Sequence, residues 1–180
     1  MIRVLVMGFG PFGAVVDNPA ARLARAVDGA ERGPVQVVGR TMDVAWERCW
    51  TQTRTAVERC APRWLIGVGV ATQRSAPAFE AWATNALRTD RSDVDGVTRA
   101  QVRADGPDRL AATLQLRAPD VLGVERSDDA GRYVCNMWLY QAIDQAPPGV
   151  AVAFLHVPVR GFEASDLLDV LELSAGWSKA

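Results

Sequence analysis

Two side chains of this 180-residue sequence, Cys135 and His156, have the chemistry of a nucleophile and a base. Cys135 lies in the stretch GRYVCNMW, shortly after Gly131. Glycine is costly inside a helix, so we expect the helix over residues 132–144 to begin after Gly131, with Cys135 in or near its first turn. The free N–H groups and the dipole at that end stabilise a thiolate and can hold an oxyanion. The pattern indicates acyl transfer by a cysteine.

His156 is the only histidine in the chain, so any mechanism that needs an imidazole must use it. It ends the apolar run VAVAFL of a strand expected over residues 150–157. In open α/β sheets, ligands bind at the carboxyl ends of the strands. A cysteine at a helix start and a histidine at the tip of the next strand are therefore expected to be neighbours, as a nucleophile and its base require.

A third group must orient the imidazole, and Glu80 in the irregular segment AFEAWATN is our candidate. Arg74, in ATQRS, is a candidate for positive charge beside the thiolate or the developing oxyanion. Each residue also has a plain structural interpretation, because single cysteines and histidines often only pack in a core. The four residues therefore indicate an active site only when they are considered together.

Short β-branched runs alternate with longer amphipathic ones along the chain. Several of these strands lack polar alternation, which is typical of strands covered by helices on both faces. The pattern predicts an α/β fold, a three-layer α/β/α sandwich around a largely parallel mixed sheet, in one domain over residues 1–180. The expected strands are 2–7, 34–39, 63–69, 120–124 and 150–157, and the expected helices are 18–28, 44–60, 107–117, 132–144 and 163–174.

The loop MGFGPFG contains G-x-G-x-x-G after the first expected strand, and three interpretations are open. It resembles a dinucleotide-binding turn, but Pro11 removes an N–H donor and the next helix start is the Asn18-Pro19 cap rather than the last glycine. It is also compatible with a plain strand-to-helix loop. In the third interpretation, it presents Phe9 and Phe12 as walls of a small-molecule pocket.

The composition excludes several functional classes. A net charge of −1 gives no reason to expect nucleic acid or an anionic membrane as a partner. No apolar run approaches the roughly 20 residues of a membrane span, so we expect a cytoplasmic protein. The three cysteines contain no C-x-x-C pair, which argues against a disulfide framework and a zinc site. Cys49 and Cys60 share one face of an expected helix and are expected to be inert core residues.

Taken together, these stretches resemble the pyroglutamyl peptidase I family, also called pyrrolidone carboxyl peptidases, from Met1 to about Phe162. The resemblance depends on GFGPFG followed by NPA, MDVAWERC, LIGVG, AGRYVCN and FLHVP, with Arg74, Glu80 and Asn85 at suitable spacing. It implies a cysteine peptidase of α/β/α fold, often a homotetramer. Such an enzyme removes N-terminal pyroglutamate from blocked peptides without a metal or a cofactor.

The resemblance also implies roles for single residues. Cys135 would be the nucleophile, His156 the base and then the acid, and Glu80 the group that orients the imidazole. Arg74 would lie near the reacting thiol. The remaining positions that it implies for substrate binding are Phe9, Phe12, Asn18, Val70, Arg91, Tyr133 and Val134.

The substrate side of the sequence departs from the family pattern. Val70, Thr72 and Gln73 stand where the family has a glutamine and a pair of glycines, and Arg91 stands where an apolar pocket residue is expected. Trp82 is bulkier than the usual residue. Two alternatives therefore remain beside the peptidase. One is a cysteine hydrolase of the same fold with another small acyl amide as substrate or little activity, and the other is a non-catalytic nucleotide-binding module that uses the glycine loop.

Overall fold

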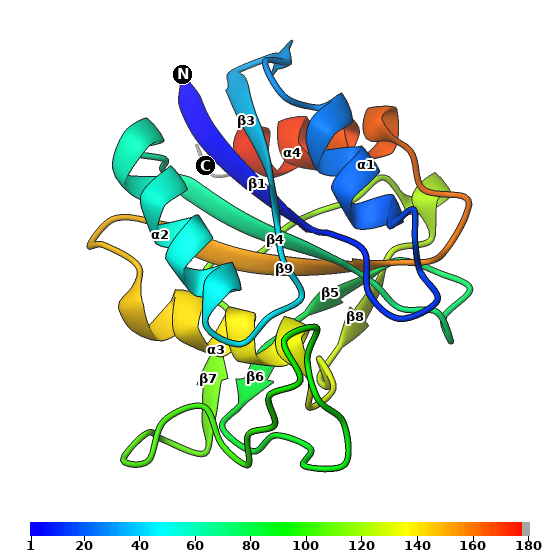
Figure 1. Ribbon diagram of the computed structural model, residues 1–180. Helices are drawn as coiled ribbons and strands as arrows, with labels where there is room; N and C mark the ends of the chain where they lie inside the picture. Colours follow the sequence, from blue (N-terminus) through cyan, green and yellow to red (C-terminus); the bar gives the residue numbers. More distant parts are fainter. Residues whose placement is uncertain (178–180) are drawn as a thin grey trace.

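The computed structural model describes residues 1–177, and in them seven strands form one mixed sheet in the order β2-β3-β1-β4-β9-β5-β8 (Figure 1). Strands β3, β1, β4 and β9 run parallel to one another, and so do β5 and β8. The pairs β2–β3 and β5–β9 are antiparallel. The strands are β1 (Ile2–Phe9), β2 (Glu31–Arg32), β3 (Val35–Met42), β4 (Trp64–Val70), β5 (Ala78–Glu80), β8 (Glu125–Ser127) and β9 (Ala151–Val157).

Helices cover both faces of this sheet (Figure 1). The helices α1 (Pro19–Ala26) and α4 (Ala164–Trp177) lie on one face, and α2 (Arg48–Cys60) and α3 (Val134–Gln145) on the other. Each face of the sheet carries its own hydrophobic core, and successive side chains of β9 pack into the two cores alternately. Phe154 packs with α2 and α3, and Leu155 packs with α1 and α4. The predicted three-layer α/β/α sandwich with a largely parallel sheet is confirmed.

The start of α1 forms as its sequence predicts. Asn18 is the N-cap, and its side-chain oxygen accepts a hydrogen bond from the Ala20 N–H at 3.0 Å. Pro19 takes the first helical position, where its missing N–H has no consequence. The helix packs very close to β1, because a Cβ atom on Gly8 would lie 2.7 Å from the Ala20 carbonyl carbon and 2.8 Å from Ala24 Cβ. Gly8 therefore serves helix–strand packing.

The prediction of a helix over residues 107–117 is wrong. The chain there forms β7 (Arg109–Ala111), which pairs with β6 (Trp82–Thr84), and then runs extended past β9. Val152 O accepts the N–H groups of both Thr113 and Leu114. The apolar side chains do not share a helical face, since Leu110 packs with the α2–α3 core and Leu114 with the core on the opposite face. The apparent periodicity reflects a segment that crosses between two cores.

Two further boundaries differ from the sequence pattern. Residues 120–124, expected as a strand, contain a 3₁₀ turn over Asp120–Leu122, and the strand β8 follows it. The second helix begins at Arg48 rather than at residue 44, because Trp46 just before it is held by a loop from elsewhere in the chain. None of the helices within residues 1–177 has the length and apolar character needed to cross a membrane.

Candidate active site

A cavity of about 560 Å³ lies where β1, β4 and β9 end, and it contains both Cys135 and His156. Phe9 ends β1, Val70 ends β4, and His156 is the next-to-last residue of β9. The start of α3 and the glycine loop after β1 close the sides. The cavity therefore has the position that the carboxyl ends of parallel strands predict for a ligand site.

Cys135 is the second residue of α3, in the first turn as the sequence predicts. Its Sγ lies against Gly69 of β4, where an added Cβ atom would be only 2.8 Å from the sulfur. Gly69 is the register partner of His156 in the adjacent strand β9. The absence of a side chain at Gly69 thus leaves room for the thiol beside the imidazole-bearing strand.

The surroundings of Cys135 favour a protonated thiol. Burial, and to a smaller extent the charge of Glu80, together raise its pKa to about 12. The backbone N–H of Cys135 and the Arg91 guanidinium lower this pKa by smaller amounts. The helix start alone would favour a thiolate, but desolvation outweighs that effect here, and the thiol needs a base to become a nucleophile.

His156 is positioned by Glu80. Its Nδ1 lies 2.7 Å from Glu80 Oε1, and both residues are buried. Ala78 of β5 is the register partner of His156, so Glu80, two residues along the strand, lies diagonally opposite on the same face of the sheet. An Nδ1–H that donates to the carboxylate fixes the tautomer in which Nε2 is free to accept a proton. The predicted orienting contact is therefore present in the structure.

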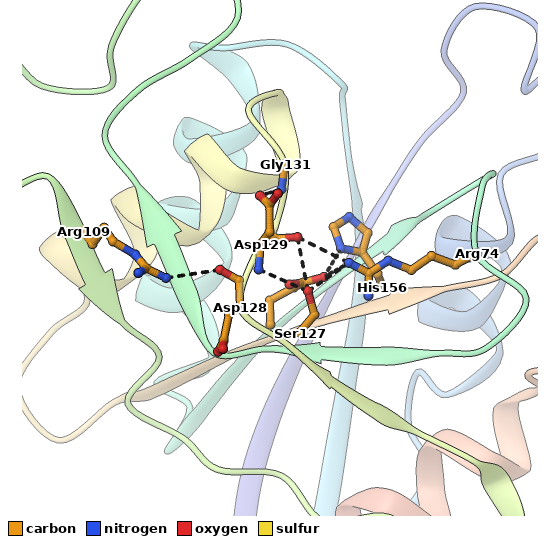
Figure 2. Close-up of polar contacts among 8 residues, drawn as sticks. Arg74, Arg109, Ser127, Asp128, Asp129, Gly131 and His156 are labelled. Atoms are coloured by element: carbon orange, nitrogen blue, oxygen red, sulfur yellow. Dashed lines mark hydrogen bonds and ion pairs between the residues drawn. The ribbon is translucent and has the colours of Figure 1, made fainter.

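Arg74 lies behind the imidazole with Glu80 rather than over the thiol. Its Nη2 is 3.2 Å from Glu80 Oε1 and donates to Ser127 Oγ at 2.9 Å and to the carbonyl of Asp129 at 3.3 Å. Figure 2 shows Arg74 reaching Ser127 and Asp129 beside His156. Arg74 thereby ties the orienting carboxylate to the segment that leads into α3.

A second arginine holds the same segment from the other side. Arg109 of β7 donates to the carbonyl of Asp128 at 3.2 Å (Figure 2). Asp129 Oδ1 accepts the N–H of Gly131 at 2.9 Å, and Gly131 has a φ of 77°, in the region that glycine tolerates best. These contacts fix the turn that leads into α3.

The thiol and the imidazole line one cavity, but no hydrogen bond joins Cys135 Sγ to His156 in the structure of residues 1–177. The imidazole instead packs edge-on against Phe154, with ring centroids 4.9 Å apart. The thiol and the imidazole thus face the same cavity without a hydrogen bond between them, and the Glu80 carboxylate contacts the imidazole from outside that cavity.

The glycine loop forms one wall of the cavity. Phe9 and Phe12 both line it, as expected from the pocket interpretation. Asn18 also lines it and donates through Nδ2 to the Gly10 carbonyl at 2.8 Å, which holds the loop against its own helix cap. The geometry does not suit a dinucleotide turn, because α1 begins only at Pro19 and Gly8 packs against the backbone of α1.

Three more of the expected substrate-binding residues, Val70, Arg91 and Tyr133, line the cavity, and one does not. Val134 is fully buried in the α2–α3 core, since successive helical residues face different directions. Trp82 also lies away from this cavity and stacks with Arg109, whose guanidinium carbon is 4.8 Å from its ring centroid.

The residues that build the rest of the site were not found from the sequence. Asp93 is buried and accepts the backbone N–H groups of Trp46, Asp95 and Val97 at 2.7, 2.9 and 2.9 Å, which shapes the loop that carries Arg91. The turn-forming letters DVDG were the available signal.

Two buried asparagines also fix the backbone near the site, and one of them, Asn85, is among the residues that carry the sequence resemblance. Asn85 accepts from Val102 and Arg103 N–H groups, and Asn136 exchanges two 2.8 Å hydrogen bonds with the backbone of Thr84 in β6. Asn136 immediately follows Cys135, so this pair fixes the first turn of α3. No cluster of three or more metal-ligating side chains occurs within residues 1–177.

The raised thiol pKa predicts how Cys135 reacts with iodoacetamide. Below a pKa of about 12, the thiolate fraction rises tenfold with each pH unit, so the rate of Cys135 alkylation is expected to rise about tenfold from pH 7 to 8 and again from pH 8 to 9. Peptide mapping by mass spectrometry follows this rate and separates Cys135 from Cys60. Cys135→Ser is the control. A rate that levels off below pH 8 would instead indicate a resting thiolate–imidazolium pair.

Comparisons with known proteins agree with this geometry. The family model described as "Pyroglutamyl peptidase" matches residues 2–167. The pyrrolidone-carboxylate peptidase of Pyrococcus furiosus is 31% identical over 169 residues, which cover 87% of this chain and 81% of that protein. The enzyme of the same name from Thermococcus litoralis is 28% identical over 170 residues, 88% of this chain and 77% of that protein.

Solved structures show the same fold. The crystal structure of pyroglutamyl peptidase I from Bacillus amyloliquefaciens superposes with a TM-score of 0.85 at 22% identity and covers 97% of this chain and 95% of that one. The pyrrolidone carboxyl peptidase from Thermococcus litoralis gives 0.82 at 23% identity, with 99% and 94% covered. From the match over residues 2–167, the chain belongs to the pyroglutamyl peptidase family, a family of cysteine peptidases.

Proposed function

We propose that this protein removes an N-terminal pyroglutamyl residue from peptides, with Cys135 as nucleophile, His156 as base and then acid, and Glu80 as the group that orients His156. The observation that supports this most strongly is the 2.7 Å contact between His156 Nδ1 and Glu80 Oε1 at the cavity that also holds Cys135. That contact leaves Nε2 as the only imidazole atom able to accept a proton from the cavity side.

The first half of the reaction forms an acyl-enzyme. Cys135 Sγ attacks the pyroglutamyl carbonyl carbon while the thiol proton passes to His156 Nε2. Because the surroundings of Cys135 favour a protonated thiol, proton transfer must accompany the attack. N–H groups at the start of α3 stabilise the oxyanion, since no side chain caps this end of the helix. The C–N bond then breaks, and Nε2 returns its proton to the departing amine.

The second half releases the acyl group. Water attacks the thioester carbonyl and gives a proton to His156 Nε2, the carbon–sulfur bond breaks, and Cys135 takes the proton back. Glu80 and Arg74 remain in place throughout, because their contacts lie behind the imidazole.

The walls of the cavity are compatible with a flat, uncharged ring. Phe9, Phe12, Val70 and Tyr133 supply apolar and aromatic surface. Pyroglutamate has no ammonium group, so it enters such a cavity without the desolvation cost that an ordinary N-terminus carries.

The test is turnover of a fluorogenic pyroglutamyl amide by the wild-type protein, compared with the prolyl amide of the same fluorophore. We expect hydrolysis of the pyroglutamyl compound only, because the prolyl ring carries a positive charge. A pyroglutamyl chloromethyl ketone should alkylate Cys135 with loss of HCl, so that the peptide containing Cys135 gains the mass of the reagent minus HCl, and it should leave the buried Cys49 unmodified. Absence of both turnover and labelling would contradict the proposal.

A further inference from the structure

One positive charge in the cavity, that of Arg91, forms no ion pair within residues 1–177. Arg91 lines the cavity together with Cys135 and His156. Its guanidinium carbon lies 4.6 Å from the Tyr133 ring centroid and 5.7 Å from that of Phe12, so the head group lies between two aromatic walls. Contacts with the face of a guanidinium leave N–H groups on its edge available, although Arg91 also interacts with the side chain of Tyr133 through a hydrogen bond.

The acidic groups nearest to Arg91 already have other partners. Asp90, its neighbour in sequence, accepts two 2.7 Å hydrogen bonds from Arg88. Asp93 accepts three backbone N–H groups, and Asp129, the acid that lines the cavity, accepts the Gly131 N–H. Within residues 1–177, Arg91 forms no ion pair with any of them.

The other arginine of the cavity differs in this respect. Arg74 is paired with Glu80 and is hydrogen-bonded to Ser127 and Asp129 (Figure 2). Its charge is therefore compensated inside the protein. Within residues 1–177, Arg91 is the cavity cation that forms no ion pair, and apart from its interaction with the Tyr133 side chain its N–H groups are available to a ligand.

Arg91 is also held in position. Tyr133 Oη donates to the carbonyl of Ser92, the next residue, at 2.8 Å, and Tyr133 itself packs edge-on against Trp46 with centroids 5.3 Å apart. On the other side, Asp93 binds the backbone of Trp46. The loop is thus fastened immediately after Arg91, and a pre-positioned guanidinium loses less entropy when it binds.

We propose that Arg91 is a specificity-determining residue that binds a carboxylate of the substrate. A planar guanidinium pairs with a carboxylate through two parallel hydrogen bonds, and the aromatic walls exclude water from one side of the pair. This inference relies on the proposed function only for the identity of the bond that is cleaved.

The carboxylate has two chemical sources, and each defines a pair of substrates. It belongs either to the acyl group, as in a succinyl amide of aminomethylcoumarin, or to the leaving group, as in the dipeptide pyroglutamyl-alanine. The neutral partners of matched size are the succinamoyl amide and pyroglutamyl-alanine amide. The ratio of kcat/KM for the charged over the neutral member measures carboxylate recognition in each pair.

Three variants separate the charge of Arg91 from its bulk. In Arg91→Gln, the ratio should fall about tenfold for one pair, through KM rather than kcat. Arg91→Lys should retain most of the preference, and high salt should weaken it in the wild type. The control is Arg54→Gln, which changes net charge equally on the exposed surface of α2, and it should leave both ratios unchanged.

The pair that responds identifies the source of the carboxylate. If neither ratio responds to Arg91→Gln, the inference is overturned. Calorimetry on Cys135→Ala makes this test independent of turnover, with succinamate against succinamide and pyroglutamyl-alanine against its amide. A carboxylate preference in binding that Arg91→Gln removes would support the inference even if the wild-type protein hydrolysed no pyroglutamyl substrate. Equal binding within both pairs would overturn it even if the proposed peptidase activity were found.

Discussion

Replacing Cys135 by alanine is expected to lower kcat for pyroglutamyl amide hydrolysis by at least about 10³-fold, because the covalent route is lost and only binding and oxyanion stabilisation remain. His156→Ala should cost a similar factor, since a thiol with a pKa of about 12 supplies almost no thiolate at neutral pH without a base. Single-turnover kinetics with a fluorogenic substrate measures both losses.

The double variant should be no slower than either single one, because the thiol and the imidazole act as one unit. Losses that multiplied in the double variant would mean that the two groups act separately, and would contradict the mechanism. Cys60→Ala is the matched control. Its thiol lies at the far end of α2, outside the cavity, so activity should stay within about twofold of wild type.

Replacing Gly8 by alanine is expected to lower the free energy of unfolding by about 3 kcal/mol. The new methyl group would overlap the Ala20 carbonyl and lie 2.8 Å from Ala24 Cβ. Ala20 belongs to the helix backbone, so α1 must move away from β1 as a unit to make room. Urea denaturation followed by circular dichroism gives the change in unfolding free energy, provided that the slope against urea concentration stays constant.

Gly176→Ala is the comparison for this result. Gly176 lies in α4, and a Cβ atom there would meet no atom within 4 Å. Helix propensity alone therefore acts, and it favours alanine by up to about 1 kcal/mol. Equal effects at Gly8 and Gly176 would show that the close contact between α1 and β1 does not limit stability.

The sequence predicts most of the sheet and the helices because the apolar pattern of each element continues over many residues. Strand β4 is buried along its whole length, and β1 and β9 are buried except at their first residues. The start of α1 also carries a specific signal, the Asn18 cap. The failure at residues 107–117 has a definite cause. Leucines spaced four apart satisfy a helical pattern even when an extended chain delivers them to opposite faces of a sheet.

The catalytic candidates could be placed for a different reason. Cys135 and His156 lie at the ends of regular elements, and parallel topology brings such ends together. The loop that carries Arg91 has no repeating apolar pattern, and its shape depends on contacts that Asp93 and Tyr133 make with residues far away in the sequence. The raised pKa of the Cys135 thiol could not be predicted from the sequence either, because it depends on burial in three dimensions.

The shared oxygen of Glu80 gives the proposed proton transfer a particular electrostatic character. Arg74 Nη2 and His156 Nδ1 both approach this oxygen, at 3.2 and 2.7 Å, and in the proposed mechanism the thiol proton passes to an imidazole that carries no proton on Nε2. When the proton moves from sulfur to nitrogen, one new anion and one new cation arise side by side, so the total charge of these four groups does not change. The step is electroneutral for the cluster as a whole, and the surrounding protein needs to respond only to a new dipole.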